Sequence, residues 1–385
     1  MPSRSSPRPV RVMHVCDKFG IRGSRVHGVS RLLSWWFPRF DRGRVEPLLV
    51  HLRGDDAAAR NLRASGVSAV SLGKGKFDPT TWGALRRAAE RFRPHVIHVH
   101  GYAGANFCRP LARLLHAKLV LHEHAAFPRV PPYQVPIDLA MASMTDAGIA
   151  VSSTTKDFMV RRRFVPASKI RVVFNGAPLD EFKPDSRERI AAVRSRFGIP
   201  RNAPLLGTVG RLDAQKGNAH LLAALPAVAA RHPEVRLLLV GEGELMDEHR
   251  AQAYALGVLD RVVFAGFSRE IPLLQSAMDV QVFPSIFEGT PLTLFEAMSM
   301  RRPIVSTWVD GLGEVLRHQE TALLVPPADP AALADALCRL LDEPSLAARL
   351  GANAQRESRR YDIQATVDAL EEIYLDLVDR RPEAA

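Results

Sequence analysis

The sequence predicts an α/β protein built from two doubly wound, Rossmann-like domains. Three observations support this prediction. Short apolar runs alternate with longer amphipathic runs, a pattern typical of a parallel sheet covered by helices on both faces. The alternation stops at a stretch rich in Asn, Gly and Pro and then starts again. The 385 residues are enough for two domains of roughly 150 residues each.

The first half of the chain contains six predicted strands and at least three helices. The strands cover residues 10–16, 45–50, 67–72, 95–99, 119–122 and 147–151. Helices are predicted at 24–37, 80–92 and 107–116. Residues 1–9, rich in Arg, Ser and Pro, are expected to form a disordered leader.

The pattern restarts after residue 180. Six further strands are predicted at 205–209, 236–240, 262–265, 280–283, 303–306 and 322–325, with helices at 220–231 and 244–255. The chain breakers at 175–178 mark the link, so the domains are expected to cover 10–177 and 178–360. A last helix at 362–378, within a final segment 361–385, is expected to cross back to the first domain. Two such domains would face each other across a central cleft, since ligands bind beyond the carboxyl ends of parallel strands.

Composition narrows the function classes. No run approaches the roughly 18 apolar residues of a membrane span, and the N-terminus lacks the apolar segment of a secretory signal. The three cysteines are far apart and suit a reducing, cytoplasmic location. The net charge of +11 favours anionic partners such as phosphates, acidic lipids or nucleic acid, or it reflects arginines on solvated faces.

The first chemical motif follows the predicted strand 205–209. Gly210, Arg211, Lys216 and Gly217 lie where this strand turns into a helix. Glycines allow close backbone approach, and a helix N-terminus binds anions. Arg and Lys add two positive charges, so a diphosphate fits this turn. The alternative is an ordinary loop with solvated cations.

The second motif contains two glutamates eight positions apart, Glu288 and Glu296. Glu288 lies in the loop after the strand 280–283, and Pro291 is predicted to be the first residue of a helix that contains Glu296. Glu296 is embedded among apolar residues, and a buried carboxylate needs hydrogen-bond donors. Sugar and ribose hydroxyls supply such donors. The alternative is a pair with a neighbouring arginine.

Together these motifs resemble the retaining glycosyltransferases of family four, also called group one. The resemblance rests on Gly-Arg-Leu at 210–212 with Lys-Gly at 216–217, Gly-Glu-Gly-Glu at 241–244 and the Glu-x7-Glu pair. Further agreement lies at 173–176, 296–298, 311 with 314, and 324–327. It extends from about residue 10 to 377 and is looser in the first domain.

The resemblance implies a GT-B fold whose second domain binds a nucleotide-diphosphate sugar, such as a UDP- or GDP-sugar, while the first lies on the acceptor side. Arg211 and Lys216 would bind the pyrophosphate, Glu296 the ribose, and Glu288 the transferred sugar. The backbone at Gly289, Thr290, Pro291 and Leu292 would face sugar and phosphate. No metal or other cofactor is expected, because the basic side chains and helix N-termini stabilise the leaving diphosphate.

The first domain contributes histidines and a glycine. His98 and His100 lie at the carboxyl end of one predicted strand, and His122 and His124 at the carboxyl end of the next. The family often has a sugar-contacting histidine here; His124 is the best match and His122 the rival. A zinc site or a purely structural cluster are the alternatives. Gly28 is the best equivalent of the family's Gly-Gly turn, which this chain otherwise lacks.

The sequence motifs do not identify the acceptor, and a saccharide or a lipid-linked saccharide is expected. Trp35, Trp36 and Phe37 beside several arginines either pack into the first domain, the favoured interpretation, or contact an anionic membrane at its inner face. The main alternative function is a non-catalytic nucleotide-sugar-binding protein. No nucleic-acid-binding motif is present, and no Gly-x-Gly-x-x-Gly follows the first strand as a dehydrogenase would require.

Overall fold

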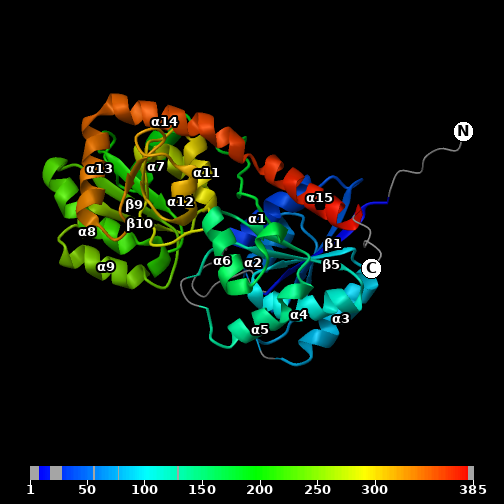
Figure 1. Cartoon of the computed structure of the whole chain (residues 1–385). Coiled ribbons are helices and arrows are strands. Elements are labelled where there is room, and N and C mark those ends of the chain that lie inside the picture. The colour runs from blue at the N-terminus through cyan, green and yellow to red at the C-terminus, as the bar shows by residue number, and fades with distance from the viewer. Residues whose placement is uncertain (1–7, 18–27, 55–56, 77, 128–129, 380–385) are drawn as a thin grey trace, which may run out of the picture. The chain divides into compact units, whose positions relative to one another are not determined.

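The computed structural model describes residues 8–17, 28–54, 57–76, 78–127 and 130–379, which form two compact units (Figure 1). The first unit contains the described residues up to Asn175 together with the segment from Ile363 onward. The second contains Gly176–Asp362. The predicted leader therefore lies almost wholly outside the described residues, as does the loop that precedes Gly28.

The first unit is built on a seven-stranded parallel sheet. Its strand order is β3-β2-β1-β4-β5-β6-β7. The strands are β1 (Val10–Cys16), β2 (Val45–His51), β3 (Ala69–Ser71), β4 (Val96–His100), β5 (Lys118–Glu123), β6 (Ala147–Ala150) and β7 (Ile170–Val172). The six predicted strands are present, and β7 is an edge strand of three residues, too short to show a hydrophobic period.

Helices cover both faces of this sheet. They are α1 (Gly28–Trp36), α2 (Ala57–Ala64), α3 (Thr81–Phe92), α4 (Tyr102–Leu114), α5 (Gln134–Met141), α6 (Ser153–Arg163) and α15 (Ile363–Asp379). In Figure 1, α3, α4 and α5 lie along one side of the sheet and α15 lies on the other. Helix α4 begins five residues before the predicted start at 107, directly after Gly101 with its φ of 77°.

The C-terminal helix α15 is an integral part of the first unit. It packs on β1 and α1. The Glu371 carboxylate accepts hydrogen bonds from the Asp41 backbone N–H at 2.7 Å and from Arg44 at 2.7 Å. The Thr366 hydroxyl donates to the carbonyl oxygen of Phe174 at 3.2 Å. These bonds fix the rotation of α15 and direct Tyr374 toward the sheet.

The second unit repeats the same architecture with six parallel strands. Their order is β10-β9-β8-β11-β12-β13. The strands are β8 (Leu205–Val209), β9 (Arg236–Val240), β10 (Val262–Gly266), β11 (Val280–Phe283), β12 (Ile304–Thr307) and β13 (Leu323–Val325), within about a residue of prediction. The helices are α7 (Arg187–Arg196), α8 (Asn218–Arg231), α9 (Met246–Ala255), α10 (Ile271–Ala277), α11 (Leu292–Ser299), α12 (Asp310–Val315), α13 (Pro330–Asp342) and α14 (Pro344–Ser358).

Each unit has its own hydrophobic core between sheet and helices. In the first unit the core is formed by residues such as Met13, Val99 and Leu121, and in the second by residues such as Leu222 and Leu237. Trp35, Trp36 and Phe37 are buried, as the favoured interpretation of that segment predicts. Within the described residues, no helix combines the length and the apolar character needed to cross a bilayer.

Candidate active site

Four loops meet at the carboxyl edge of the second sheet because glycines let their backbones touch. A Cβ atom at Gly241 would lie 1.8 Å from the carbonyl oxygen of Gly210, and one at Gly311 would lie 1.8 Å from that of Gly289. Such distances are far below van der Waals contact, so no side chain fits. The loops after β8, β9, β11 and β12 are thereby held together in one cluster.

The turn after β8 is arranged around Asp213. Its side chain caps the short 3-10 turn Ala214–Lys216 by accepting a hydrogen bond from the Lys216 backbone N–H at 3.2 Å. It also pairs with Arg211 at 2.5 Å. Gly217 follows with φ of 64°, and a Cβ there would lie 2.0 Å from the carbonyl oxygen of Pro284. This geometry brings the start of α8 against the loop after β11.

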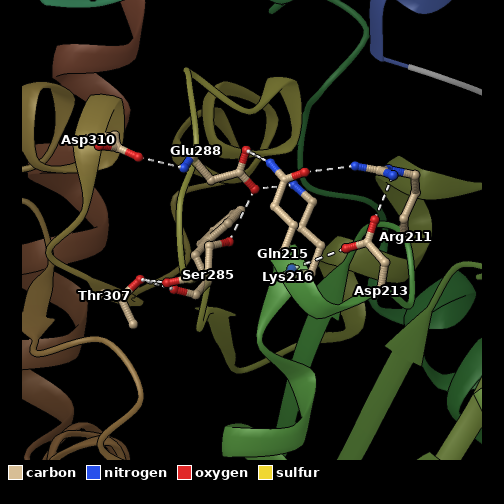
Figure 2. A network of polar contacts seen from close by, with 9 residues as sticks. Arg211, Asp213, Gln215, Lys216, Ser285, Glu288, Thr307 and Asp310 are labelled. Carbon is tan, nitrogen blue, oxygen red and sulfur yellow. Dashed lines mark hydrogen bonds and ion pairs between the residues drawn. The ribbon is translucent and has the colours of Figure 1, made fainter. Parts of the chain in front are cut away.

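Glu288 is the centre of the polar network in Figure 2. Its carboxylate pairs with the Lys216 ammonium and accepts hydrogen bonds from Gln215 at 3.2 Å and from Ser285 at 3.1 Å. Its backbone N–H donates to Asp310 at 3.0 Å. Glu288 is 5% exposed, so these donors offset the cost of burying a carboxylate.

The network extends in both directions from Glu288. Arg211 donates to the side-chain oxygen of Gln215 at 2.9 Å, which links the arginine to the glutamate through one amide. On the other side, the Thr307 hydroxyl donates to the carbonyl oxygen of Ser285 at 2.7 Å and fixes the loop after β11 against β12. Arg211, Lys216 and Glu288, predicted as site residues from separate motifs, are therefore adjacent.

The other predicted residues of the second unit lie in or just before α11. Gly289 and Thr290 are buried in the loop, and Glu296 is fully buried inside the helix. Pro291 was predicted to be the first helical residue. It is instead the N-cap, with ψ of 133°, and the helix begins at Leu292. Proline fits either position because its missing N–H is not needed there.

Asp310 is a site residue that the sequence analysis did not predict. It has a φ of 35°, in the left-handed region that side-chain-bearing residues rarely adopt. Burial raises the pKa of its carboxyl, and the nearby charges of Glu288 and Glu314 act in the same direction. Ser285 and Gln215 were missed as well. No motif flags them, because their role depends only on their distance to Glu288.

The first unit holds a buried histidine cluster, formed by His14, His98, His100, His122 and His124. His98 and His100 lie within β4 and His122 lies within β5; His100 is one residue beyond the predicted strand 95–99. Their rings stack closely; the centroids of His122 and His124 are 4.1 Å apart. His14 was missed, although its place opposite His98 follows from the β1–β4 register.

Two hydrogen-bonded chains run through the cluster. In one, His14 Nδ1 and His100 Nε2 are 3.2 Å apart, and His100 Nδ1 and His124 Nε2 are 3.0 Å apart. In the other, Tyr374 Oη lies 2.6 Å from His98 Nδ1, and His98 Nε2 lies 3.1 Å from His122 Nδ1. A neutral imidazole has one donor and one acceptor, so all protons in a chain point the same way.

The direction of the protons in the first chain depends on the tautomer that each of the three histidines adopts. His124 is partly exposed and His122 is buried, so His124 is the more accessible of the two predicted candidates.

Burial favours the neutral form of four histidines of this cluster. It lowers the pKa of His14 to about 3 and holds the pKa values of His98, His100 and His122 well below the ordinary value, with the neighbouring histidines adding to the effect. In two overlapping triplets, His14–His98–His100 and His100–His122–His124, the ring nitrogens lie within 4.8 Å of one another. Neutral imidazoles at such distances are potential zinc ligands, although several of these nitrogens already hydrogen-bond to one another.

Gly28, the predicted equivalent of a Gly-Gly turn, is the first residue of α1 and is exposed. Among the described residues, no atom lies within 4 Å of the position that a Cβ atom would take there. Its space therefore does not require glycine, in contrast to Gly241 and Gly311. The basis for assigning Gly28 to a ligand site remains the resemblance alone.

Two family models match this chain. The model described as "Glycosyltransferase Family 4" matches residues 24–181, and the one described as "Glycosyl transferases group 1" matches 203–343. Each match falls largely within one of the two structural units. Together they agree with the family that the motifs indicate.

Similar proteins include enzymes and a solved structure. Alpha-D-kanosaminyltransferase of Streptomyces kanamyceticus is 30% identical over 276 residues, covering 70% of this chain and 71% of the relative. UDP-Gal:alpha-D-GlcNAc-diphosphoundecaprenol alpha-1,3-galactosyltransferase of Escherichia coli is 26% identical over 307 residues, covering 77% and 73%. Anabaena HepE in complex with UDP superposes with a TM-score of 0.83 at 20% identity, covering 95% and 100%, and has the same GT-B fold.

The named relatives are catalysts, which favours an enzyme over a non-catalytic binding protein. The motifs, the adjacency of Arg211, Lys216 and Glu288, and both family matches agree. The chain belongs to the group 1 glycosyltransferases of family 4, and it is an enzyme that moves a sugar from a nucleotide-sugar donor to an acceptor.

Proposed function

We propose that the chain transfers a sugar from a UDP- or GDP-sugar to a hydroxyl of a saccharide or lipid-linked saccharide, with retention of anomeric configuration and without a metal ion. The observation that carries this proposal is the ion pair of Lys216 with Glu288 at the edge where four loops converge. It combines a cation for a diphosphate with an acceptor for sugar hydroxyls in one small volume.

In this proposal Arg211 and Lys216 bind the pyrophosphate. The start of α8, which follows Gly217, adds backbone N–H groups and the positive end of a helix dipole. These groups stabilise the negative charge that develops as the bond between sugar and diphosphate breaks. They are held in place before the reaction by Asp213 and Gln215, so little reorganisation is needed.

The glutamates and the loop after β11 are proposed to orient the donor. Glu296 would bind the ribose hydroxyls, and Glu288 the hydroxyls of the transferred sugar. The backbone from Gly289 to Leu292 would face sugar and phosphate. In the first unit, His124 is proposed to contact the sugar and Gly28 to lie near the phosphates. His124 is held by a hydrogen bond of 3.0 Å between its Nε2 and Nδ1 of His100.

Retention is proposed to proceed by attack on the face that the diphosphate leaves. A double displacement needs a nucleophile on the opposite face of the sugar. Glu288 and Glu296 are both proposed to bind hydroxyl groups, so neither of them serves as that nucleophile. The departing phosphate would help to deprotonate the acceptor hydroxyl. The cationic side chains Arg211 and Lys216 take the charge-stabilising role that a metal ion has in other phosphate chemistry.

The acceptor class is proposed from the relatives and the charge. The Escherichia coli relative is named for a diphosphoundecaprenol-linked acceptor. A lipid-linked acceptor would require the protein to act at a membrane, and the net charge of +11 favours an anionic one. We therefore propose a cytoplasmic enzyme with peripheral contact to the inner face of the membrane, and no nucleic-acid partner.

Thermal unfolding against UDP, GDP, ADP and TDP, with single-stranded DNA and NAD as controls, tests the donor site. A ligand at 100 times its dissociation constant stabilises by about 2.7 kcal/mol. We expect one nucleotide class to stabilise the wild type and not Lys216→Met or Glu296→Gln. The exposed Lys183 and Glu234 of the same unit provide matched controls, Lys183→Met and Glu234→Gln.

Turnover of the matching nucleotide sugar tests the chemistry. Lys216→Met and Glu288→Gln are each expected to lower turnover at least about 100-fold, the loss typical of one preorganised electrostatic contact. Activity should survive a chelator, and the product anomer, read by NMR, should match the donor. Near-normal turnover in both variants would refute the site assignment. Nucleotide binding with no turnover of any donor, hydrolysis included, would favour a non-catalytic binding protein.

A further inference from the structure

Helix α5 has its polar residues inside and its apolar residues outside. Its two buried residues are Gln134 and Asp138. Leu139, in contrast, is 62% exposed, and Pro136 and Ala140 are exposed as well. A surface helix of a globular protein normally has the opposite arrangement, with its apolar stripe on the core.

The inner face of α5 is fixed by hydrogen bonds, so the orientation is specific. Asp138 accepts from Arg109 at 2.6 Å and from Arg163 at 2.8 Å. Gln134 exchanges two hydrogen bonds with Asn106, at 3.1 and 3.0 Å. Turning the helix to bury Leu139 would leave Arg109 and Arg163 buried without this carboxylate, which is strongly unfavourable.

The interior behind α5 explains why polar groups lie there. Glu123 on β5 pairs with Arg163 at 2.7 Å, on the sheet face opposite to the neighbouring His122 and His124. Glu123, Asp138, Arg109 and Arg163 thus form a fully buried group of two negative and two positive charges. Asp138 is the only charged residue of α5. The outer surface of the helix is therefore left without charge.

Exposed apolar side chains continue around the helix. Tyr133, directly before α5, is 51% exposed, and Leu114 at the end of α4 is 49% exposed. Arg113 beside Leu114 donates to the carbonyl oxygen of Ser143 at 3.0 Å, which places the end of α4 next to the end of α5. We call the following residues the α5 patch: Leu114, Tyr133, Pro136, Leu139 and Ala140. It holds three of the nine large hydrophobic residues exposed in the described chain.

The neighbouring helices surround this patch with positive charge. Helices α4 and α6 both contact α5. Arg113 is exposed in the last turn of α4, and Arg161 and Arg162 in the last turn of α6. Asp157 is the one exposed carboxylate of these two helices. An uncharged apolar surface bordered by arginines matches the boundary of a bilayer, with acyl chains beneath anionic headgroups.

We infer that the α5 patch is the surface by which the protein contacts an anionic lipid bilayer. The inference rests on the proposed membrane contact and gives it a location. The α5 patch takes the place of Trp35, Trp36 and Phe37 as the candidate membrane-contacting surface, because these three residues are buried. Leu139 and Tyr133 enter the outer acyl region, while Arg113, Arg161 and Arg162 contact the headgroup phosphates. Such a contact is shallow and reversible, as for other interfacial helices.

Vesicle co-sedimentation of the whole protein tests this contact. We expect binding to vesicles that contain phosphatidylglycerol and little binding to phosphatidylcholine alone. Leu139→Asp should weaken binding at least about tenfold, because the apolar surface of one leucine is no longer buried in the lipid and a negative charge takes its place. Leu259→Asp, at an exposed leucine of the second unit, should bind like the wild type. Replacing Arg161 and Arg162 by Gln should lower the affinity for anionic vesicles about fivefold for each arginine.

A labelling experiment reports the location without relying on a disruptive charge. All three native cysteines are buried, so a polarity-sensitive fluorophore can be attached to Leu139→Cys or to the control Leu259→Cys. Anionic vesicles should shift the emission to the blue at position 139 and not at 259. Both variants should keep the wild-type thermal shift with UDP or GDP. This separates a failure of the patch from a failure of the donor site.

Three outcomes would overturn the inference. One is absent binding to phosphatidylglycerol vesicles, or equal binding to phosphatidylcholine. Another is full binding by Leu139→Asp together with no emission shift at position 139. The third is a wild-type dimer in light scattering that Leu139→Asp dissociates, because the patch would then be an interface between two copies of the chain.

Discussion

The histidine cluster predicts that acid destabilises the first unit. His14, His98, His100 and His122 are buried, and burial lowers their pKa values far below those of an unfolded chain. Between the folded and unfolded pKa, the unfolded chain binds more protons, so stability rises with pH. The stabilisation is complete above the unfolded pKa of about 6.5 and is lost as pH falls below it.

The size of the effect follows from the protonation of unfolded histidine alone. When pH falls from 7.5 to 5.5, each buried neutral histidine lowers the free energy of unfolding by about 1.4 kcal/mol, and the four together lower it by about 5.5 kcal/mol. Glu123 and Glu371 act in the opposite direction, because burial raises the pKa of both carboxyls. Both glutamates are present in the wild type and in His14→Leu, so the difference in unfolding free energy between these two proteins cancels their contribution.

Urea unfolding at the two pH values, followed by tryptophan fluorescence, measures this difference. Trp35, Trp36 and Trp82 lie in the first unit and Trp308 in the second, so a Trp308→Phe background reports on the first unit. The ring of Trp36 stacks on His122 at 5.8 Å. We expect His14→Leu to reduce the pH-dependent loss by about 1.4 kcal/mol. An unchanged loss in His14→Leu, or a wild type equally stable at both pH values, would refute the reasoning.

Two further predictions concern stability elsewhere. Gly241→Ala should lower the melting temperature strongly and abolish nucleotide binding, since its Cβ would lie 1.8 Å from Gly210 O. Gly257 has a φ of 66° but no described atom within 4 Å of an added Cβ, so Gly257→Ala should lower the free energy of unfolding by only about 1 kcal/mol. Equal losses of stability in the two variants would contradict the close packing of the loops. Arg163→Met should lower the free energy of unfolding by about 3–5 kcal/mol because it leaves Glu123 and Asp138 short of a partner. Arg161 is exposed, so Arg161→Met should change the free energy of unfolding by no more than about 0.5 kcal/mol. Similar unfolding free energies for the two variants would contradict this prediction.

The fold was largely predictable because its signal is local. Parallel strands buried on both faces are continuous apolar runs, and twelve of the strands were identified in this way. Strand β7 was not, and α5 is one of several helices that the sequence analysis did not name. β7 has three residues, and α5 lacks an inward apolar face because its core side is occupied by Gln134 and Asp138. A helix that buries charges cannot be detected by hydrophobic periodicity.

The site was predictable in its motifs but not in its pairings. Arg211, Lys216, Glu288 and Glu296 follow from sequence patterns at strand ends. Ser285, Gln215 and Asp310 become site residues through hydrogen bonds of 3.0 to 3.2 Å to Glu288, and those of Gln215 and Asp310 come from other loops. The same holds for Tyr374, which reaches His98 across 276 positions of the chain. Such contacts are set by tertiary packing, which spacing in a single sequence does not encode.

The pairing of Lys216 with Glu288 has a consequence for ligand affinity. A diphosphate that binds Lys216 must compete with this carboxylate and is repelled by it. Two unit charges at roughly 8 Å, with an effective dielectric constant of about 20, repel by about 2 kcal/mol, or about 30-fold in affinity. Glu288→Gln keeps the shape and removes the charge. It should therefore bind the nucleoside diphosphate more tightly in calorimetry while its turnover falls. Weaker binding in Glu288→Gln would mean instead that Glu288 positions Lys216 for the phosphate, and the competition argument would fail.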